Sequence, residues 1–355
     1  MRRLVILSTL ILASAIAHAD STQIKVGALL CFTGSCAADG QAALQGMELA
    51  VSELKSAHPE LSITILPEDT AEATSAATAV SAFRKLYSSG VRIFIGPSWS
   101  SAAKALAPIM AKQSDIVVLT PSSGTPDFHL AGKNLFNLRG TDGSAVERTA
   151  EVARKIGVNT VGIFGSQQSW SVEQTETFEK TFIRLGGKVP VKVEPLPGET
   201  RLSGDALKLL SAKPEGVFIS VFAESPLAVT ELAAKRYSGK KFAAAVMPYL
   251  LEQAPTAFEG TIFTTFTNPS GVFADAYESR FKVKPLVASG GGYDAIMVIA
   301  SSIPVDKQEE LAKKILASKV SGAFGPITFD ENGCVKREPE TFQVVNQRIT
   351  RYNPE

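Results

Sequence analysis

Residues 91–120 read VRIFIGPSWSSAAKALAPIMAKQSDIVVLT. The apolar runs at 91–95 and 116–120 predict two buried strands, and residues 100–112 between them predict a helix. A helix that joins two strands apolar along their whole length is typical of a parallel sheet covered on both faces. This stretch therefore places the chain in the α/β class.

The same alternation continues on both sides of this stretch. Upstream, residues 24–30 and 61–66 predict strands, and apolar residues at helical spacing follow each of them. Downstream, a second series begins near Thr141, with Asp142 as the expected cap of a helix and strands at 160–164 and 217–222. The last third of the chain is too short for a doubly wound sheet of its own. We therefore expect two similar α/β lobes with several chain crossings between them.

The first nineteen residues have the pattern of a secretory signal. A basic start, Met1 to Arg3, precedes an apolar run at 4–16 and the small-residue site Ala17-His18-Ala19. The apolar run is shorter than a membrane span requires, which disfavours an anchor. We expect cleavage after Ala19 and export to the periplasm.

Composition and motifs exclude several function classes. The 355 residues include 36 basic and 35 acidic ones, so the chain lacks the positive surplus that nucleic-acid binding requires. The phosphate-binding GxxxxGK[ST], the dinucleotide GxGxxG, the zinc HExxH and the nucleophile GxSxG are missing. His58 and His129 lie in polar, turn-like sequence and are expected on the surface. We therefore predict no catalysis, no metal and no cofactor.

Three cysteines are present, at positions 31, 36 and 334. Export implies an oxidising compartment, and a disulfide between Cys31 and Cys36 would close a small loop. Cys334 is then left over. The alternative is three free thiols.

Two loops rich in hydroxyl groups follow predicted strands. One is 96–101, directly before a helix, and the other is 120–126. Ligands of open α/β sheets bind at the carboxyl ends of the strands, and a helix N-terminus favours an anion. We therefore expect a carboxylate site formed by these loops, although such residues also cap helices and make turns. The candidate residues are Ser100, Ser101, Thr120, Ser122, Ser123 and Thr125.

Five short markers in order give the chain a wider resemblance. They are Ile24-Lys25-Val26-Gly27 with Phe32-Thr33-Gly34, Ile95-Gly96 with Ser100-Ser101, Thr120-Pro121 with Pro126, Gly292-Tyr293-Asp294-Ala295, and Gly325-Pro326 with Phe329-Asp330. The mature chain resembles the periplasmic solute-binding proteins of ABC importers, in the branch of the leucine/isoleucine/valine-binding protein.

The resemblance implies the type I periplasmic binding fold, with two Rossmann-like lobes, parallel central sheets and a three-stranded hinge. The expected first lobe is 20–139 with 266–328, and the expected second lobe is 140–265 with 329–355. It also implies a monomer that closes on a small ligand and delivers it to a membrane permease. A ligand-sensing regulator or receptor domain of the same fold is the alternative.

The family's ligand residues match this sequence unevenly. Ser100 matches the carboxylate-binding Ser, and Thr120 to Ser123 match backbone positions of the second loop. Gly124 stands where the family places a Thr that meets the ligand ammonium, with Ser123 or Thr125 as substitutes. Trp170 and Phe222 match aromatic positions of the second lobe. Asp39 lies near the position where the family places a Tyr of the first loop.

The acid that pairs with the ammonium should follow Phe242, but Ala243, Ala244 and Ala245 stand there. A buried ammonium without a counter-charge costs several kcal/mol. Either Asp39 or Glu224 supplies the charge for an amino acid, which is the family's usual ligand, or the ligand is a carboxylate or amide without an ammonium, such as an aromatic acid.

Overall fold

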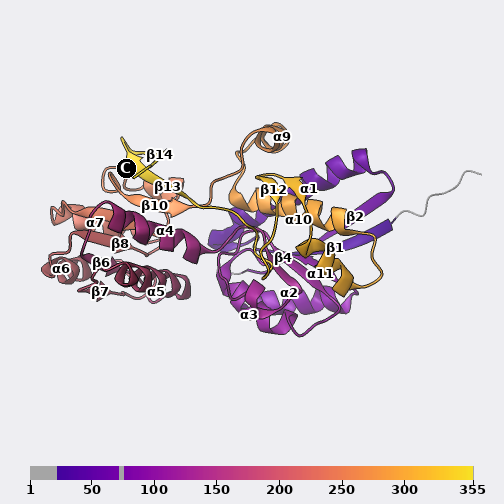
Figure 1. The fold of residues 1–355 in the computed structure, drawn as a ribbon, viewed down its shortest axis with the longest axis horizontal. Helices are drawn as coiled ribbons and strands as arrows, with labels where there is room; N and C mark the ends of the chain where they lie inside the picture. Colours follow the sequence, from indigo (N-terminus) through magenta and orange to yellow (C-terminus); the bar gives the residue numbers. More distant parts are fainter. Residues whose placement is uncertain (1–21, 72–75, 355) are drawn as a thin grey trace, which may run out of the picture.

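The computed structural model describes residues 22–71 and 76–354. Two groups of helices and strands lie side by side along the longest axis of the molecule, with thin connections between them (Figure 1). The expected signal at 1–19 lies outside the described residues and stays a prediction. None of the helices in the described part is long and apolar enough to cross a membrane.

The first lobe is built on a five-stranded parallel sheet in the order β2-β1-β3-β4-β5. Within β1, Val26, Ala28 and Leu30 face one core and Leu29 faces the other, as the two-residue period of a strand requires. The strands are β1 (Thr22–Leu30), β2 (Leu61–Asp69), β3 (Ile93–Ile95), β4 (Val117–Thr120) and β5 (Leu135–Asn137).

Helices cover both faces of this sheet. Apolar residues of α1 (Ala37–Ala57), α10 (Val287–Ser302) and α11 (Gln308–Leu316) form the core on one face, and those of α2 (Ala76–Ser88) and α3 (Ser100–Met110) form the core on the other. Helices α1 and α10 cross closely because glycines meet there: a Cβ on Gly46 would lie 1.9 Å from the Ser289 carbonyl oxygen. The short helices η1 (Gly34–Cys36) and η2 (His129–Ala131), and the hairpin of β11 (Val320–Gly322) with β12 (Gly325–Ile327), complete the lobe.

The second lobe contains a seven-stranded sheet in the order β14-β13-β10-β9-β8-β6-β7. The five strands from β10 to β7 are parallel, and β13 and β14 add an antiparallel edge. The strands are β6 (Val161–Phe164), β7 (Lys192–Val193), β8 (Gly216–Ile219), β9 (Lys240–Ala243), β10 (Ile262–Thr265), β13 (Glu340–Val345) and β14 (Arg348–Arg351).

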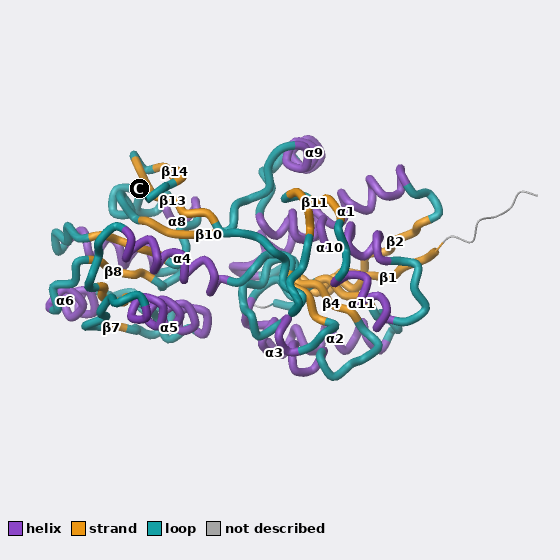
Figure 2. Tube along the Cα trace, in the orientation of Figure 1, coloured by secondary structure: helices purple, strands orange, loops and turns teal. Residues whose placement is uncertain are grey.

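Helices also enclose this second sheet, with one core against α4 and α5 and another against α6 and α7. Figure 2 shows the same layering, with helices outside the strands in both lobes. The helices are α4 (Asp142–Lys155), α5 (Ser169–Arg184), α6 (Ser203–Ser211), α7 (Ser225–Ala234) and α8 (Pro248–Leu251). Helix α9 (Val272–Phe281) packs instead on α1 of the first lobe, where Tyr277 donates to Gln45. The predicted α/β fold with two lobes and parallel central sheets is confirmed.

Within the described residues the chain passes between the sheets after β5, after β10 and before β13. At the first passage Gly140 has φ +93°, and Phe266 of the second passage packs where a Cβ would stand. We propose that the third passage begins after Val335, later than the boundary expected at 328, because Phe329 and Val335 lie in the core of the first lobe.

A buried ion pair braces the region of the third passage. Asp294 of α10 is fully buried and accepts hydrogen bonds from the Ala323 N–H (2.6 Å) and from Arg337 (3.2 Å). The Arg337 guanidinium also stacks 3.6 Å above the centre of the Phe324 ring. Burial raises the pKa of Asp294 to about 6, although Arg337 opposes this shift. The pair therefore holds the β11–β12 hairpin against α10.

We expect Arg337→Met to lower the free energy of unfolding at pH 8 by about 3–5 kcal/mol, because it leaves a buried carboxylate without its cation. Without Arg337 the pKa of Asp294 rises further, so the loss should be smaller at pH 5, where the remaining carboxyl is protonated in the folded protein. Urea unfolding at the two pH values measures both effects.

The control for this variant is Arg351→Met, which breaks a pair between exposed Arg351 and Glu340 and should change stability little. An equal loss for Arg337→Met at both pH values would show that Arg337 does not act by compensating the charge of Asp294.

The structure joins Cys31 to Cys36 in a disulfide, with 5.7 Å between their Cα atoms. It lies directly after β1, at the entry to α1. Cys334 is a free thiol and is buried, and burial raises its pKa to about 12. Because the thiolate is the reactive form, Cys334 should be inert in the folded protein.

We therefore predict that a thiol reagent finds no reactive thiol in the folded, unreduced protein and one per chain after unfolding. Reduction before unfolding should raise the count to three. Three thiols in the unfolded but unreduced protein would contradict the disulfide.

Candidate functional site

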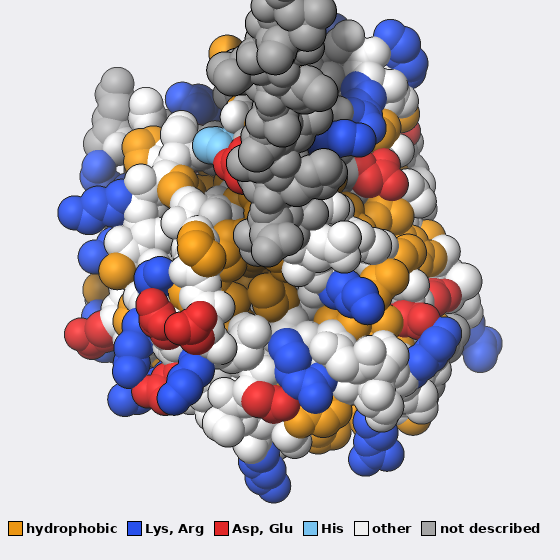
Figure 3. Space-filling view, turned by 90° about the vertical axis from the view of Figure 1, so that its right-hand side faces the viewer, with side chains coloured by type: hydrophobic (Ala, Val, Ile, Leu, Met, Phe, Trp, Pro, Cys, Tyr) orange, Lys and Arg blue, Asp and Glu red, His pale blue; other side chains and the backbone are white. Residues whose placement is uncertain are grey.

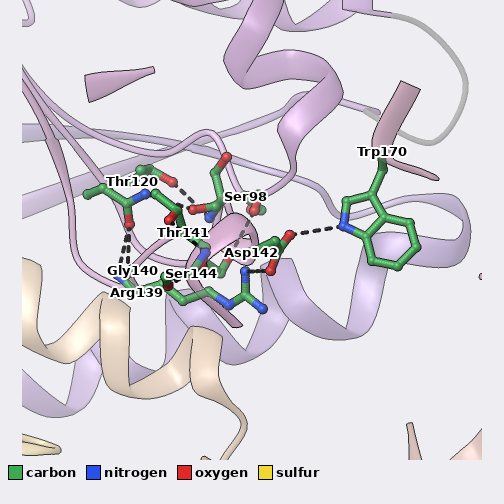
Figure 4. A network of polar contacts seen from close by, with 11 residues as sticks. Ser98, Thr120, Arg139, Gly140, Thr141, Asp142, Ser144 and Trp170 are labelled. Atoms are coloured by element: carbon green, nitrogen blue, oxygen red, sulfur yellow. Dashed lines mark hydrogen bonds and ion pairs between the residues drawn. The ribbon is translucent and has the colours of Figure 1, made fainter. Parts of the chain in front are cut away.

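The loops that follow β3 and β4 are tied to each other at the carboxyl end of the first sheet. The Thr120 hydroxyl donates to the Pro97 carbonyl oxygen (2.7 Å), and the Ser122 hydroxyl donates to the Ser98 carbonyl oxygen (2.9 Å). Thr120 also accepts from the Ser123 N–H at 3.1 Å. Figure 4 shows these contacts around Thr120 and Ser98. Two of the predicted ligand hydroxyls thus shape the site by fixing one loop against the other.

A buried side-chain amide holds the rest of the second loop. Asn137, at the end of β5, donates to the Ser123 carbonyl oxygen (3.0 Å) and accepts from the backbone N–H groups of Arg139 and Gly140. Thr125 is buried, and its hydroxyl accepts the Asp127 N–H at 3.4 Å. The Thr125 side chain therefore makes a turn, as the alternative interpretation of these loops proposed.

The N-terminus of α3 lies beside these loops. Ser100 is its first residue, and Trp99 precedes it in extended conformation without a capping hydrogen bond from its side chain. Ser100 is half-buried and Ser101 is exposed. The helix has eleven residues, and the N-terminus of such a helix favours an anion through its N–H groups and its partial positive charge.

Three aromatic rings form a row that spans the two lobes. Phe222 follows β8 of the second lobe, and its ring centre lies 5.6 Å from Trp170 of α5 and 6.3 Å from Trp99 of the first lobe. Both contacts are edge-to-face, with interplanar angles of 75° and 77°. Such edge contacts favour a fixed geometry between the rings. Sequence reasoning selected Trp170 and Phe222 but passed over Trp99.

Asp39 lies in the first turn of α1 and accepts a hydrogen bond from the Trp99 indole N–H at 2.9 Å. The negative charge of Asp39 also acts on Tyr249 of α8, in the second lobe. Burial raises the pKa of Tyr249, and the charge of Asp39 raises it further. Asp39 therefore lies beside the aromatic row, and its role toward a ligand stays a prediction.

A second acid of the cleft, Asp142, was expected only to cap α4. In the structure Thr141 is the cap residue and accepts from the Ser144 N–H, and Asp142 is the first residue of the helix. Its side chain instead pairs with Arg139 and accepts from the Trp170 indole N–H at 2.9 Å. Figure 4 shows the Trp170 ring pointing its nitrogen at Asp142. Opposite charges at positions 139 and 142 allow such a pair, but the same spacing is ordinary on any helix, so the sequence did not reveal it.

Gly124 is in contact with this ion pair. A Cβ built on Gly124 would lie 2.1 Å from an Asp142 oxygen and 2.4 Å from Nη1 of Arg139. The Thr that the resemblance led us to expect therefore has no room here, because the ion pair fills the space of its side chain. Both charged side chains are still slightly exposed, at 15% for Asp142 and 17% for Arg139.

The other proposed sources of negative charge lie elsewhere. Glu224 turns into the second lobe and accepts the Gly198 N–H at 2.6 Å. Ala243 ends β9, and Ala244 and Ala245 follow without adding a carboxylate. Of the two acids expected as a counter-charge, Asp39 and Glu224, Asp39 is the one bound to a residue of the aromatic row.

An ion pair also joins the two lobes, and its side chains line a pocket of about 630 Å³. The Lys104 ammonium of α3 lies 2.7 Å from the Glu173 carboxylate of α5 and 3.4 Å from the Ser169 hydroxyl. Burial raises the pKa of Glu173, and Lys104 opposes this shift. The ion pair thus holds α3 and α5 together beside the aromatic row.

Within residues 22–71 and 76–354, no three residues among His, Cys, Asp and Glu gather into a possible metal site. His58 is exposed and pairs with Glu60, as expected. The expectation for His129 was wrong: it is 6% exposed, and burial lowers its pKa. It begins η2 directly after buried Phe128, which draws the turn into the protein.

Comparison with known proteins identifies the fold. A family model described as "Periplasmic binding protein" matches residues 23–347. The chain belongs to this family. The resemblance seen in the sequence is thereby confirmed, and the family is one of solute-binding proteins.

Relatives of this periplasmic binding protein are distant in sequence but close in length and shape. The Leu/Ile/Val-binding protein BraC3 of Rhizobium johnstonii is 24% identical over 342 residues, which cover 90% of this chain and 89% of the relative. The structure of a leucine binding protein, LivK, from Thermotoga maritima has a TM-score of 0.81 at 24% identity and covers 93% of this chain and 98% of its own. A solute binding protein of an ABC transporter from R. palustris, in complex with benzoate, has a TM-score of 0.79 at 19% identity and covers 94% and 96%.

Proposed function

We propose that this protein is the solute-binding component of an ABC importer of the branched-chain amino acid type. It is exported by a signal cleaved after Ala19, works in the periplasm as a monomer, and delivers a small carboxylate ligand to a membrane permease. It binds without chemistry and without a cofactor. The family match and the two-lobed fold support the solute-binding part of this proposal.

The proposed class of ligand, a carboxylate, rests on the N-terminus of α3. Ser100 is the first residue of this helix and brings a hydroxyl to the end that carries the partial positive charge. The tied loops after β3 and β4 fix this helix end against the sheet. We infer that the ligand carboxylate binds the N–H groups of this turn and the Ser100 hydroxyl.

The aromatic row supports an apolar ligand body and a closing motion. Trp99 belongs to the first lobe and Phe222 and Trp170 to the second, so a ligand between the lobes contacts aromatic faces from both.

The surface at the free end of the first lobe mixes positive and negative side chains (Figure 3). This face therefore does not favour a polyanionic partner.

Two subclasses of carboxylate ligand fit the N-terminus of α3 and the aromatic row. Relatives named as Leu/Ile/Val-binding make an amino acid the first candidate, with Asp39 as the acid for its ammonium. The second candidate is a carboxylate without an ammonium. It is favoured by the Ala243 to Ala245 stretch and by the ion pair that fills the space at Gly124, and a benzoate complex exists among the structural neighbours.

We expect at least one small carboxylate to raise the melting temperature in a screen of aliphatic and aromatic amino acids, aromatic acids and short aliphatic acids. Binding to the folded state alone stabilises it by about 2.7 kcal/mol at 100 times Kd. The amide and alcohol analogues of each hit should give no shift. If no carboxylate stabilises the protein, the proposed function is wrong.

Ser100→Ala should weaken binding of the hit by about 1–3 kcal/mol, because a hydrogen bond to a charged group is lost. Calorimetry measures the change in Kd. Ser203→Ala is the matched control, since Ser203 also begins a helix, α6, but lies in the second lobe against Lys235. Equal affinities for the wild type and Ser100→Ala would place the carboxylate elsewhere.

A further inference from the structure

The ion pair between Arg139 and Asp142 lies where the first passage between the lobes, the proposed carboxylate site and the aromatic row come together. Arg139 lies on the first passage between the lobes, and Asp142 begins α4 of the second lobe. The pair packs directly on Gly124 of the second loop, and Trp170 of the aromatic row donates to Asp142. Any ligand held at α3 and covered by the aromatic row therefore lies close to these two charges.

The charge of Asp142 is already balanced. One carboxylate oxygen pairs with Arg139 and the other accepts the Trp170 indole N–H. Arg139 is fixed from its other side by the Phe266 ring, 5.4 Å from the guanidinium carbon. An ammonium group brought next to Asp142 would thus meet a neutral pair whose cation cannot move away freely.

The other acid of the cleft is placed differently. Asp39 is bound to Trp99, on the first lobe, and its negative charge contributes to the raised pKa of Tyr249, whereas the side chains that surround Gly124 are those of Asp142 and Arg139. The position at Gly124, where the resemblance placed an ammonium contact, is therefore served by the ion pair and not by Asp39.

We propose that the Arg139–Asp142 ion pair selects ligands that carry a carboxylate but no ammonium group. This inference rests on the proposed function, since it assumes a carboxylate bound at α3. Arg139 acts as a specificity-determining residue: by neutralising Asp142 it removes the counter-charge that an amino acid requires. Without Arg139, Asp142 becomes an uncompensated acid at the ligand site.

The test compares acids that differ only in the ammonium group. The pairs are 4-methylpentanoate with leucine and 3-phenylpropanoate with phenylalanine, each titrated by calorimetry into the wild type and the variants. We expect the wild type to bind the acid without ammonium at least about tenfold more tightly than the amino acid in the pair that fits its pocket. Tighter binding of the amino acid would overturn the inference without reference to any variant.

Arg139→Met should then shift the affinity ratio toward the amino acid by about tenfold or more, and Arg139→Lys, which keeps the charge, should preserve the wild-type ratio. The double variant Arg139→Met with Asp142→Asn should lose the gain, because the freed acid is gone. Lys104→Met is the matched control: it removes another cation from an inter-lobe ion pair and should change both affinities by the same factor.

The outcomes separate the two proposals. If neither member of a pair binds any variant, the carboxylate site itself fails and the inference fails with it. If both members bind and Arg139→Met leaves their ratio unchanged, the inference alone is wrong. If Asp39→Asn changes the ratio instead, Asp39 recognises the ammonium and the role assigned to Arg139 is refuted.

Discussion

The constraint on which this structure depends is that two parallel sheets are buried on both faces. Helices cover each sheet, so the strands are apolar along their length and the polar side chains gather at the strand ends. In the first lobe the loops after β3 and β4 meet at one end of the sheet and are joined by hydroxyl-to-carbonyl hydrogen bonds. The candidate site therefore lies at the strand ends, where the buried sheet gives way to polar loops.

The positions of the two hydroxyl-rich loops after β3 and β4 could be predicted from the sequence, but the hydrogen bonds of their hydroxyl groups could not. Strand and helix periods are local, so the alternation around residues 91–120 was sufficient to place Ser100 at the start of a helix. The partners of Thr120 and Ser122 are carbonyl groups more than twenty residues away, and no period links them. The hydroxyl-rich second loop therefore proved to be largely a brace for the first.

The ion pair at Gly124 shows a second limit of sequence reasoning. Arg139 and Asp142 lie in an irregular passage between lobes, where backbone direction depends on Gly140 and on packing against Phe266. Their separation by three residues is also ordinary on any helix, so it does not distinguish a cleft pair from a cap. The same limit applies to His129, whose polar neighbours suggested exposure while the adjacent Phe128 is buried.

The chain contains two tryptophans, and both stand in the cleft, one on each lobe. Each indole N–H is bound to a carboxylate, Trp99 to Asp39 and Trp170 to Asp142, and both rings touch Phe222. Indole fluorescence responds to the polarity and hydrogen bonding around the ring. All tryptophan emission of the protein therefore comes from the two sides of the candidate site, so the molecule carries an optical reporter of cleft opening and filling that needs no attached label.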